Sequence, residues 1–230
     1  MKAVLFDLDN TLYPEMEFVK SGFRTVARYL SSRYDFNEDS LFTQMLDILQ
    51  RNGRGKVFDT LLYNLSLYQG ERVRLLVHLY RSHHPTIHLY EDTMPTLEHL
   101  RRRGIRLGVV TDGMASTQKN KIAALGLENI FDAIVCTDEL GKEFWKPSIV
   151  PYKVALDLLE VSPSEAAYVG NDPVKDFVGA NSIKMLTIQV TRETDRDYMP
   201  NGIPEPARAN FIVRRLEETL PIIEGKLDVY

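Results

Sequence analysis

Two carboxylates follow the first apolar segment of the chain, in the stretch VLFDLDN. Asp7 and Asp9 stand one residue apart directly after the run AVLF at 3–6. Side chains of an extended chain alternate in direction, so two residues at this spacing point the same way, or converge where the chain turns. The pattern predicts two acids in one small space, an arrangement suited to nucleophilic and acid–base chemistry.

Further polar residues stand directly after later apolar runs. They are Thr111, Asp112 and Gly113 after IRLGVV, and Asn171 and Asp172 after AAYVG. Ligands of open parallel sheets bind beyond the carboxyl ends of the strands, so these residues are candidates for one site. Lys146 lies in FWKPS, between the apolar runs at 133–136 and 166–169. Pro147 suits the first position of a helix, which predicts a helix entrance there.

The acids in this set favour a metal site. Several carboxylates at one sheet edge repel one another and rise in pKa unless a cation joins them. Hard oxygen ligands around an open site suit Mg²⁺, which commonly takes one or two carboxylates plus a substrate phosphate. A phosphoryl-transfer site combines a metal with a lysine, a hydroxyl and a second carboxylate. In such a site Asp7 can attack the phosphorus, and Asp9 can donate and accept the proton.

Short apolar or β-branched runs indicate the strands that position these residues. The runs lie at 3–6, 105–110, 133–136, 166–169, 185–190 and 211–213. From residue 93 onward they alternate with helix-like segments. This alternation predicts an α/β fold with a doubly wound, Rossmann-like parallel sheet covered on both faces. The polar, proline-rich stretch near 195–210 is interpreted as a surface loop.

The interval from about 15 to 91 breaks this rhythm, because it shows helical periodicity and no convincing strand. We therefore expect two parts: a catalytic core at 1–14 and 92–230, and an inserted helical cap at 15–91. Within the cap, the basic segment RNGRGK at 51–56 is interpreted as a solvated turn, or as a loop that reaches a substrate. His83, His84 and His88 are interpreted as a solvated linker rather than a metal cluster, since Pro85 interrupts a helix that would align them.

Bulk composition excludes several classes of function. The 230 residues carry a net charge of −4, so the chain has no global basic field for a nucleic acid or an anionic membrane surface. The single cysteine, Cys136, rules out an internal disulfide and is expected to be buried. No apolar run approaches the roughly 20 residues of a membrane span, and the first residues resemble a strand rather than a signal peptide. A cytoplasmic protein is the expectation, with its oligomeric state open.

Four motifs in a fixed order carry a family resemblance. FDLDNT, VVTDG, KP and VGNDPVKDFVGA together resemble the haloacid dehalogenase (HAD) superfamily of phosphohydrolases, in the branch with a helical cap after the first motif. The form DNTLYP is similar to pyrimidine nucleotidase-like members, and phosphoglycolate phosphatases belong to the same branch. The resemblance implies a Mg²⁺-dependent phosphatase that acts on a small phosphorylated metabolite, with a cap that closes to exclude water.

The resemblance also implies roles for individual residues. Asp7 would be the nucleophile that forms an aspartyl-phosphate and would bind Mg²⁺. Asp9 would protonate the leaving oxygen, later activate water, and lend its backbone carbonyl to the metal. Thr111 and the backbone N–H groups of Asp112 and Gly113 would hold the phosphoryl oxygens.

The remaining roles concern the charges around the nucleophile. Lys146 would offset the charge on Asp7 and on the phosphoryl group, Asp172 would complete the metal site, and Asp176 would support it. Many members read Gly-Asp where this chain reads Gly170-Asn171-Asp172, so Asn171 is an alternative metal ligand through its amide oxygen. The choice between Mg²⁺ and Mn²⁺ also stays open.

Each motif has a plainer interpretation. The residues after Asp9 can form a turn with an Asx cap, Thr111 and Asp112 can cap a helix, and Lys146 can be a surface lysine. Asp172 and Asp176 can cap a helix that starts near Pro173.

Other functions compete with the phosphatase. A 2-haloacid dehalogenase of the superfamily lacks the second acid, a phosphomutase keeps it, and a phospho-accepting module would take up phosphate without turnover. A scaffold without activity would bind no Mg²⁺.

Overall fold

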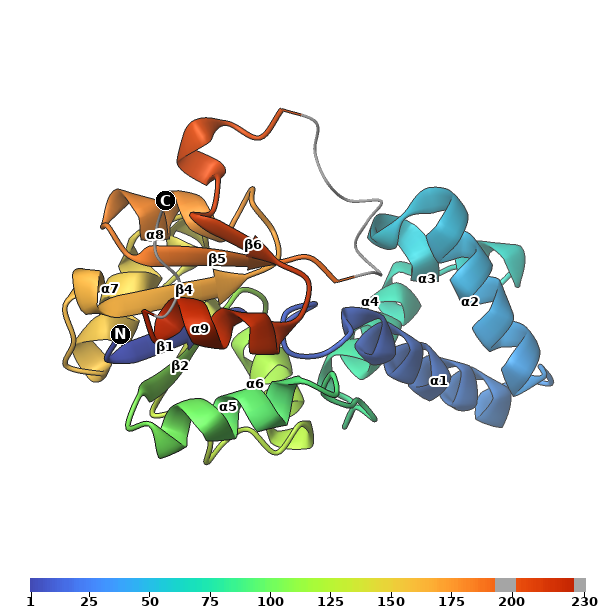
Figure 1. Cartoon of the computed structure of the whole chain (residues 1–230). Coiled ribbons are helices and arrows are strands. Elements are labelled where there is room, and N and C mark those ends of the chain that lie inside the picture. Colours follow the sequence, from blue (N-terminus) through green and yellow to red (C-terminus); the bar gives the residue numbers. More distant parts are fainter. Residues whose placement is uncertain (193–201, 226–230) are drawn as a thin grey trace. The chain divides into compact units, whose positions relative to one another are not determined.

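The computed structural model describes residues 1–192 and 202–225 (Figure 1). It divides into two compact units, a core unit of Met1–Glu15 with His88–Tyr230 and a cap unit of Met16–Ile87. The sequence predicts a cap at 15–91, and its role as a separate domain stays a prediction. Of the loop predicted near 195–210, residues 195–201 lie outside the described residues.

The core unit contains, in its described part, a six-stranded parallel sheet with the order β3-β2-β1-β4-β5-β6 (Figure 1). The strands are β1 (Ala3–Phe6), β2 (Arg106–Thr111), β3 (Ala133–Cys136), β4 (Ala166–Gly170), β5 (Leu186–Val190) and β6 (Phe211–Val213). Nearly every residue of β1, β2 and β4 is buried, as expected for parallel strands covered on both faces. The predicted fold class is confirmed.

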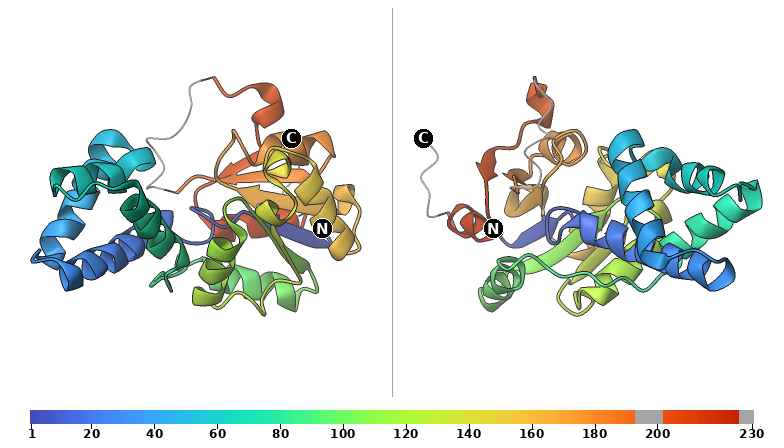
Figure 2. Two further views of the ribbon diagram at one scale, coloured as in Figure 1. Left: turned by 180° about the vertical axis from the view of Figure 1, so that it is seen from behind. Right: turned by 90° about the vertical axis from the view of Figure 1, so that its right-hand side faces the viewer.

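Helices cover both faces of this sheet (Figures 1 and 2). They are α5 (Thr93–Arg102), α6 (Ala115–Ala124), α7 (Val150–Leu158), α8 (Phe177–Ser182) and α9 (Thr219–Ile223). The connection through α6 leads from β2 outward to β3, whereas α7 leads back across the sheet to β4. Since parallel crossovers are right-handed, this reversal places α6 and α7 on opposite faces.

The reversal creates the place where a site can form. β1 lies between β2 and β4, and Phe6 pairs with Val109 on one side and Val169 on the other. The Asp7 backbone N–H extends the ladder by donating to the Val169 carbonyl at 2.9 Å. Asp7 therefore leaves the sheet at its topological switch point, the usual ligand position of doubly wound sheets.

A buried cluster under α7 and α8 fixes the elements around this point. It joins Leu5 of β1 to Tyr152 of α7, Tyr168 of β4 and Phe177 of α8, all with no exposed surface. The rings of Tyr152 and Tyr168 meet edge to face, with centroids 4.9 Å apart. Such aromatic contacts are geometrically specific, so they hold the connections after β3 and β4 against β1.

The cap unit is helical in all its longer elements: α1 (Glu15–Arg33), α2 (Glu38–Asn52), α3 (Val57–Asn64) and α4 (Gly70–Ser82). Their apolar faces form a core of their own. Gly22 allows the close approach of α1 and α4, since a Cβ there would lie 2.4 Å from the Tyr80 ring.

The expectation of a solvated linker is wrong for one of the three histidines near the end of α4. His83 is buried, and its ring nitrogens lie 2.7 Å from the Tyr80 carbonyl and 3.1 Å from the Ser21 hydroxyl. His84 and His88 are exposed.

Candidate active site

A tight turn follows β1 and carries the second acid. Asn10 adopts φ 59°, a left-handed conformation that asparagine tolerates well, and its N–H donates to the Tyr13 carbonyl at 3.0 Å. The Asn10 side-chain oxygen accepts from the Glu15 N–H at 2.9 Å, at the start of α1. The turn expected after Asp9 is therefore present, with the Asn10 side chain bonded to the first residue of α1, and it turns the chain directly beyond Asp7 and Asp9.

Asp7 is a buried carboxylate held by two donors. Its Oδ1 lies 2.5 Å from the Lys146 ammonium, and its Oδ2 accepts from the Thr11 hydroxyl at 3.2 Å. Burial raises the pKa of Asp7 from 3.8 to about 7, against the opposing effect of Lys146. A group with this pKa can bind a proton or a cation near neutrality.

Lys146 lies in the loop after β3, and its buried side chain contacts residues that follow β1 and β4. Its ammonium also lies 2.8 Å from the Asp176 carboxylate and 3.1 Å from the Tyr168 hydroxyl, with 1% of its side chain exposed. Burial alone would lower the pKa of Lys146, but Asp176 and Asp7 raise it well above its ordinary range. The interpretation as an ordinary surface lysine is wrong. The helix-entrance prediction at Pro147 is also wrong, because α7 begins at Val150.

The loop after β4 is organised by Asp176. Its Oδ2 accepts from the backbone N–H groups of Asn171 and Asp172, at 3.0 and 2.9 Å. Gly170 permits this, because a Cβ at that position would lie 2.5 Å from the same oxygen. The Asp172 carboxylate accepts from the Val174 N–H at 2.9 Å and lies 3.3 Å from the Lys175 ammonium.

The alternative in which the two acids cap a helix near Pro173 is wrong for α8. This helix begins at Phe177 and has no side-chain cap. Asp176 instead holds the preceding loop and Lys146.

The end of β2 carries a hydroxyl and a fixed turn. Thr111 is buried, and Gly113 adopts φ 120°, which favours glycine. The Asp112 carboxylate accepts hydrogen bonds from the Thr137 hydroxyl at 2.7 Å and from the Lys146 backbone N–H at 3.2 Å. The helix-cap interpretation of Thr111 and Asp112 is wrong, because α6 begins at Ala115 with Met114 at its cap position.

Asp9 is held by residues that the sequence motifs do not include. The Lys121 ammonium lies 2.7 and 3.0 Å from its two carboxylate oxygens, and Gln118 Nε2 donates to Oδ2 at 2.9 Å. The Tyr13 hydroxyl also donates to Asp9. Burial would raise the pKa of Asp9, but Lys121 and these hydrogen bonds lower it below its ordinary value.

A signal for Lys121 and Gln118 exists in the sequence. They are three residues apart in a segment predicted to be helical, so they share one face.

The donor types present fit a magnesium ion. Among the described residues, no group of three or more His, Cys, Asp or Glu side chains could hold a metal by itself. Asp7 and Asp172 supply two carboxylates, and Asn171 and the Asp9 backbone supply neutral oxygens. Mg²⁺ characteristically takes one or two carboxylates and completes its octahedron with water and substrate phosphate, so an oxygen-only set with few acids suits it.

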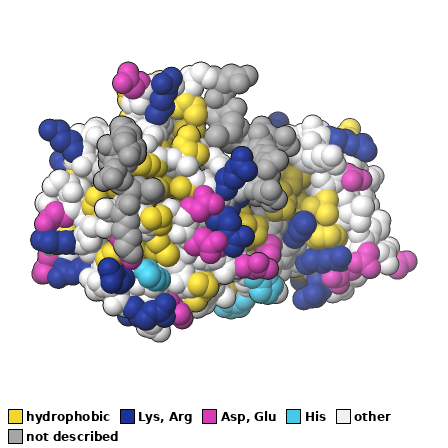
Figure 3. Space-filling view, in the orientation of Figure 1, with side chains coloured by type: hydrophobic (Ala, Val, Ile, Leu, Met, Phe, Trp, Pro, Cys, Tyr) yellow, Lys and Arg dark blue, Asp and Glu magenta, His cyan; other side chains and the backbone are white. Residues whose placement is uncertain are grey.

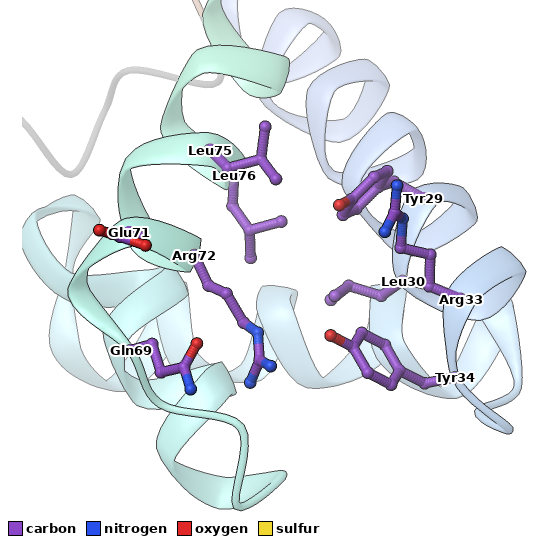
Figure 4. A pocket seen from close by; sticks show the side chains of 9 residues that line it. All are labelled: Tyr29, Leu30, Arg33, Tyr34, Gln69, Glu71, Arg72, Leu75 and Leu76. Carbon is purple, nitrogen blue, oxygen red and sulfur yellow. The ribbon is translucent and has the colours of Figure 1, made fainter.

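A separate cavity of about 300 Å³ lies within the cap unit, between α1 and α4 (Figure 4). Arg33 and Tyr34 face Arg72 across it, over the buried side chains of Leu30 and Leu76. None of the predicted site residues lines this cavity. Of the basic segment 51–56, residues 54–56 form an exposed 3₁₀ turn in the cap, and its contact with a substrate stays a prediction.

Surface charge is mixed. Basic and acidic side chains are interspersed on the face shown in Figure 3, in keeping with the small net charge of −4. Within the described residues, no helix has both the length and the apolar character needed to cross a membrane. Cys136 is buried, as predicted.

Comparison with known families identifies the class of protein. The family model described as haloacid dehalogenase-like hydrolase matches residues 4–190, which include the ends of β1, β2 and β4 that carry the candidate site residues. The chain belongs to this family, and the predicted resemblance is confirmed.

Named relatives narrow the class. The chain is 31% identical to glyceraldehyde 3-phosphate phosphatase of Methanopyrus kandleri, with 97% of each chain covered. It is 30% identical to ribulose-1,5-bisphosphate 5-phosphatase of Halopiger xanaduensis, over 96% of this chain and 98% of the relative. Among solved structures, a HAD phosphatase from Thermococcus onnurineus matches with a TM-score of 0.63 and 28% identity over the whole of both chains. The expected class, a HAD-like phosphatase, is confirmed at the level of the family and its named relatives.

Proposed function

We propose that this protein is a Mg²⁺-dependent phosphohydrolase of small phosphorylated metabolites that works through an aspartyl-phosphate on Asp7, with Asp9 as general acid and base. The observation that supports this most is the separate attachment of the two acids beyond β1. Asp7 lies against Lys146 at 2.5 Å, while Asp9 lies against Lys121 at 2.7 Å. Two carboxylates in different environments can take different roles in one reaction.

In the first half-reaction, an Asp7 oxygen bonds to phosphorus as the bond from phosphorus to the leaving oxygen breaks. Asp9, protonated in the substrate complex, gives this proton to that oxygen, so the alcohol leaves neutral. In the second, Asp9 takes a proton from water, the water oxygen bonds to phosphorus, and the bond to Asp7 breaks. Inorganic phosphate leaves and both acids return to their starting states.

Charge on the transferring group must be balanced at each stage. Lys146, paired with Asp7 and Asp176, supplies a fixed positive charge beside the attacking oxygen. The Thr111 hydroxyl and the N–H groups after β2 are assigned to the phosphoryl oxygens. Asp7, Asp172 or Asn171 and the Asp9 carbonyl would hold a Mg²⁺ ion, which would supply the remaining charge neutralisation.

We infer that small sugar phosphates are the first substrates to test, because the named relatives act on glyceraldehyde 3-phosphate and ribulose 1,5-bisphosphate. The role of the cap unit in choosing the leaving group stays a prediction. Asp9 favours phosphate esters over haloacids, since an ester intermediate hydrolysed at carbon does not need its proton transfers.

The test is phosphate release from sugar phosphates, nucleoside monophosphates and phosphoglycolate, and halide release from haloacids, with Mg²⁺ or with EDTA. Metal-dependent multiple turnover that is lost in both Asp7→Asn and Asp9→Asn supports the proposal. Halide release, or a single phosphate taken up without turnover, contradicts it and favours a dehalogenase or a phospho-accepting module respectively.

A further inference from the structure

Helix α6 carries two buried polar side chains that end on Asp9. Lys121 and Gln118 are 4% and 2% exposed, and both reach the same carboxylate. A lysine is rarely buried unless it is paired, because removing an ammonium from water is costly. The pairing with Asp9 compensates this cost, so the position of Lys121 is tied to that acid.

Gln118 links the two halves of the site. Its Nε2 donates to Asp9 Oδ2 at 2.9 Å and to the Thr111 hydroxyl oxygen at 2.5 Å. The Gln118 side chain also lies close to the turn after β2, since a Cβ at Gly113 would lie 3.3 Å from it. The amide therefore sets the separation between the acid after β1 and the hydroxyl at the end of β2.

A second lysine on α6, Lys119, lies in a different environment from Lys121. Lys119 lies two residues before Lys121, and 57% of its side chain is exposed, against 5% for Lys121. Its ammonium pairs with Glu139 at 2.5 Å. A surface ion pair of this kind contributes little. Only the face of α6 that carries Gln118 and Lys121 is directed at the site.

We propose that Lys121 and Gln118 are positioning residues, which hold the Asp9 carboxylate where it can exchange a proton with the leaving oxygen and then with the attacking water. This inference rests on the proposed function, and it adds a second lysine whose work differs from that of Lys146. Lys146 faces the nucleophile, whereas Lys121 faces the proton carrier. Neither Lys121 nor Gln118 needs to touch the substrate.

The main test is steady-state kinetics of Lys121→Met on the best phosphate ester, with Lys119→Met as the matched control. Displacing a catalytic group by about 1 Å costs up to about 100-fold, so we expect kcat to fall roughly 10- to 100-fold. KM should stay within about twofold, because the binding groups are unchanged. Lys121→Arg should recover part of kcat, and Lys119→Met should match the wild type.

A double-mutant cycle separates positioning from general structural damage. If Lys121 acts through Asp9, then Lys121→Met should not further lower the slow residual single-turnover rate, measured with enzyme in excess, in an Asp9→Asn background. Gln118→Leu, which is nearly isosteric, should show the same dependence and provides a second route should Lys121→Met fold poorly. Additive losses, a raised KM with unchanged kcat, or wild-type kinetics in both variants would each overturn the inference.

The two proposals fail in different ways. A wild-type protein without metal-dependent turnover refutes the proposed function and, with it, this inference. An active wild type that is disabled by Asp9→Asn but unaffected by Lys121→Met and Gln118→Leu refutes the inference alone.

Discussion

Replacing Asp7, the proposed nucleophile, should stabilise the metal-free protein, and more so at higher pH. Asp7 has a pKa of about 7 in the folded chain against an ordinary value of 3.8. Between these values the folded state binds a proton that the unfolded state has released. Stability therefore falls as pH rises through this window, by a total of about 4 kcal/mol. Asparagine has no proton to lose, so Asp7→Asn escapes this cost while Asp176 still pairs with Lys146.

The measurement is urea unfolding in EDTA at pH 5 and pH 8, for the wild type and Asp7→Asn. The chain has a single tryptophan, Trp145, which adjoins Lys146 in the core unit and reports its unfolding by fluorescence. At about 1.4 kcal/mol per pH unit from pH 5 to about 7, the advantage of the variant should grow by about 3 kcal/mol. Equal pH dependence in the two proteins would refute the reasoning, because it would mean that Asp7 is not a costly buried charge.

Other changes test other parts of the site. Gly170→Ala should displace the Asp176 carboxylate, which a Cβ would meet at 2.5 Å; we expect a loss of about 1–3 kcal/mol in urea unfolding, together with impaired turnover. Arg192→Met should cost about 3–5 kcal/mol, because it leaves the buried Asp92 carboxylate without its partner at 2.7 Å. Binding of Mg²⁺ at pH 6 should release close to one proton from Asp7 and almost none at pH 8.5, as measured by calorimetry in buffers of different ionisation enthalpy.

The sheet could be predicted because each strand has its own sequence pattern, and the same pattern recurs in several strands. Each buried strand is a short apolar run, and the carboxyl ends of parallel strands meet at one edge whatever the detailed packing. That geometry alone brings Asp7, Thr111 and the loop at Asn171 to the same end of neighbouring strands.

The contributions of helices and loops were harder to predict. A motif search follows strand ends, so it passes over Lys121 on α6, whose role depends on a contact with Asp9 across 112 residues of sequence. The start of α7 was misplaced because Pro147 belongs to the preceding loop, where it follows a cis peptide bond. His83 looked solvated because its partner Ser21 lies on another helix.

The sequence also could not show how the environments of the two acids differ, since DxD is symmetric as a string of letters. The structure breaks that symmetry through what surrounds each carboxylate. Burial raises the pKa of Asp7, and a neighbouring ammonium lowers that of Asp9. A cation bound beside Asp7 would favour its ionised form, so in the proposed reaction the metal that neutralises the substrate would also activate the nucleophile. Asp9 is paired with Lys121 and stays ionised without a metal. This fits its proposed role as the base that takes a proton from water, whereas its proposed role as the acid of the first step requires that it first bind a proton.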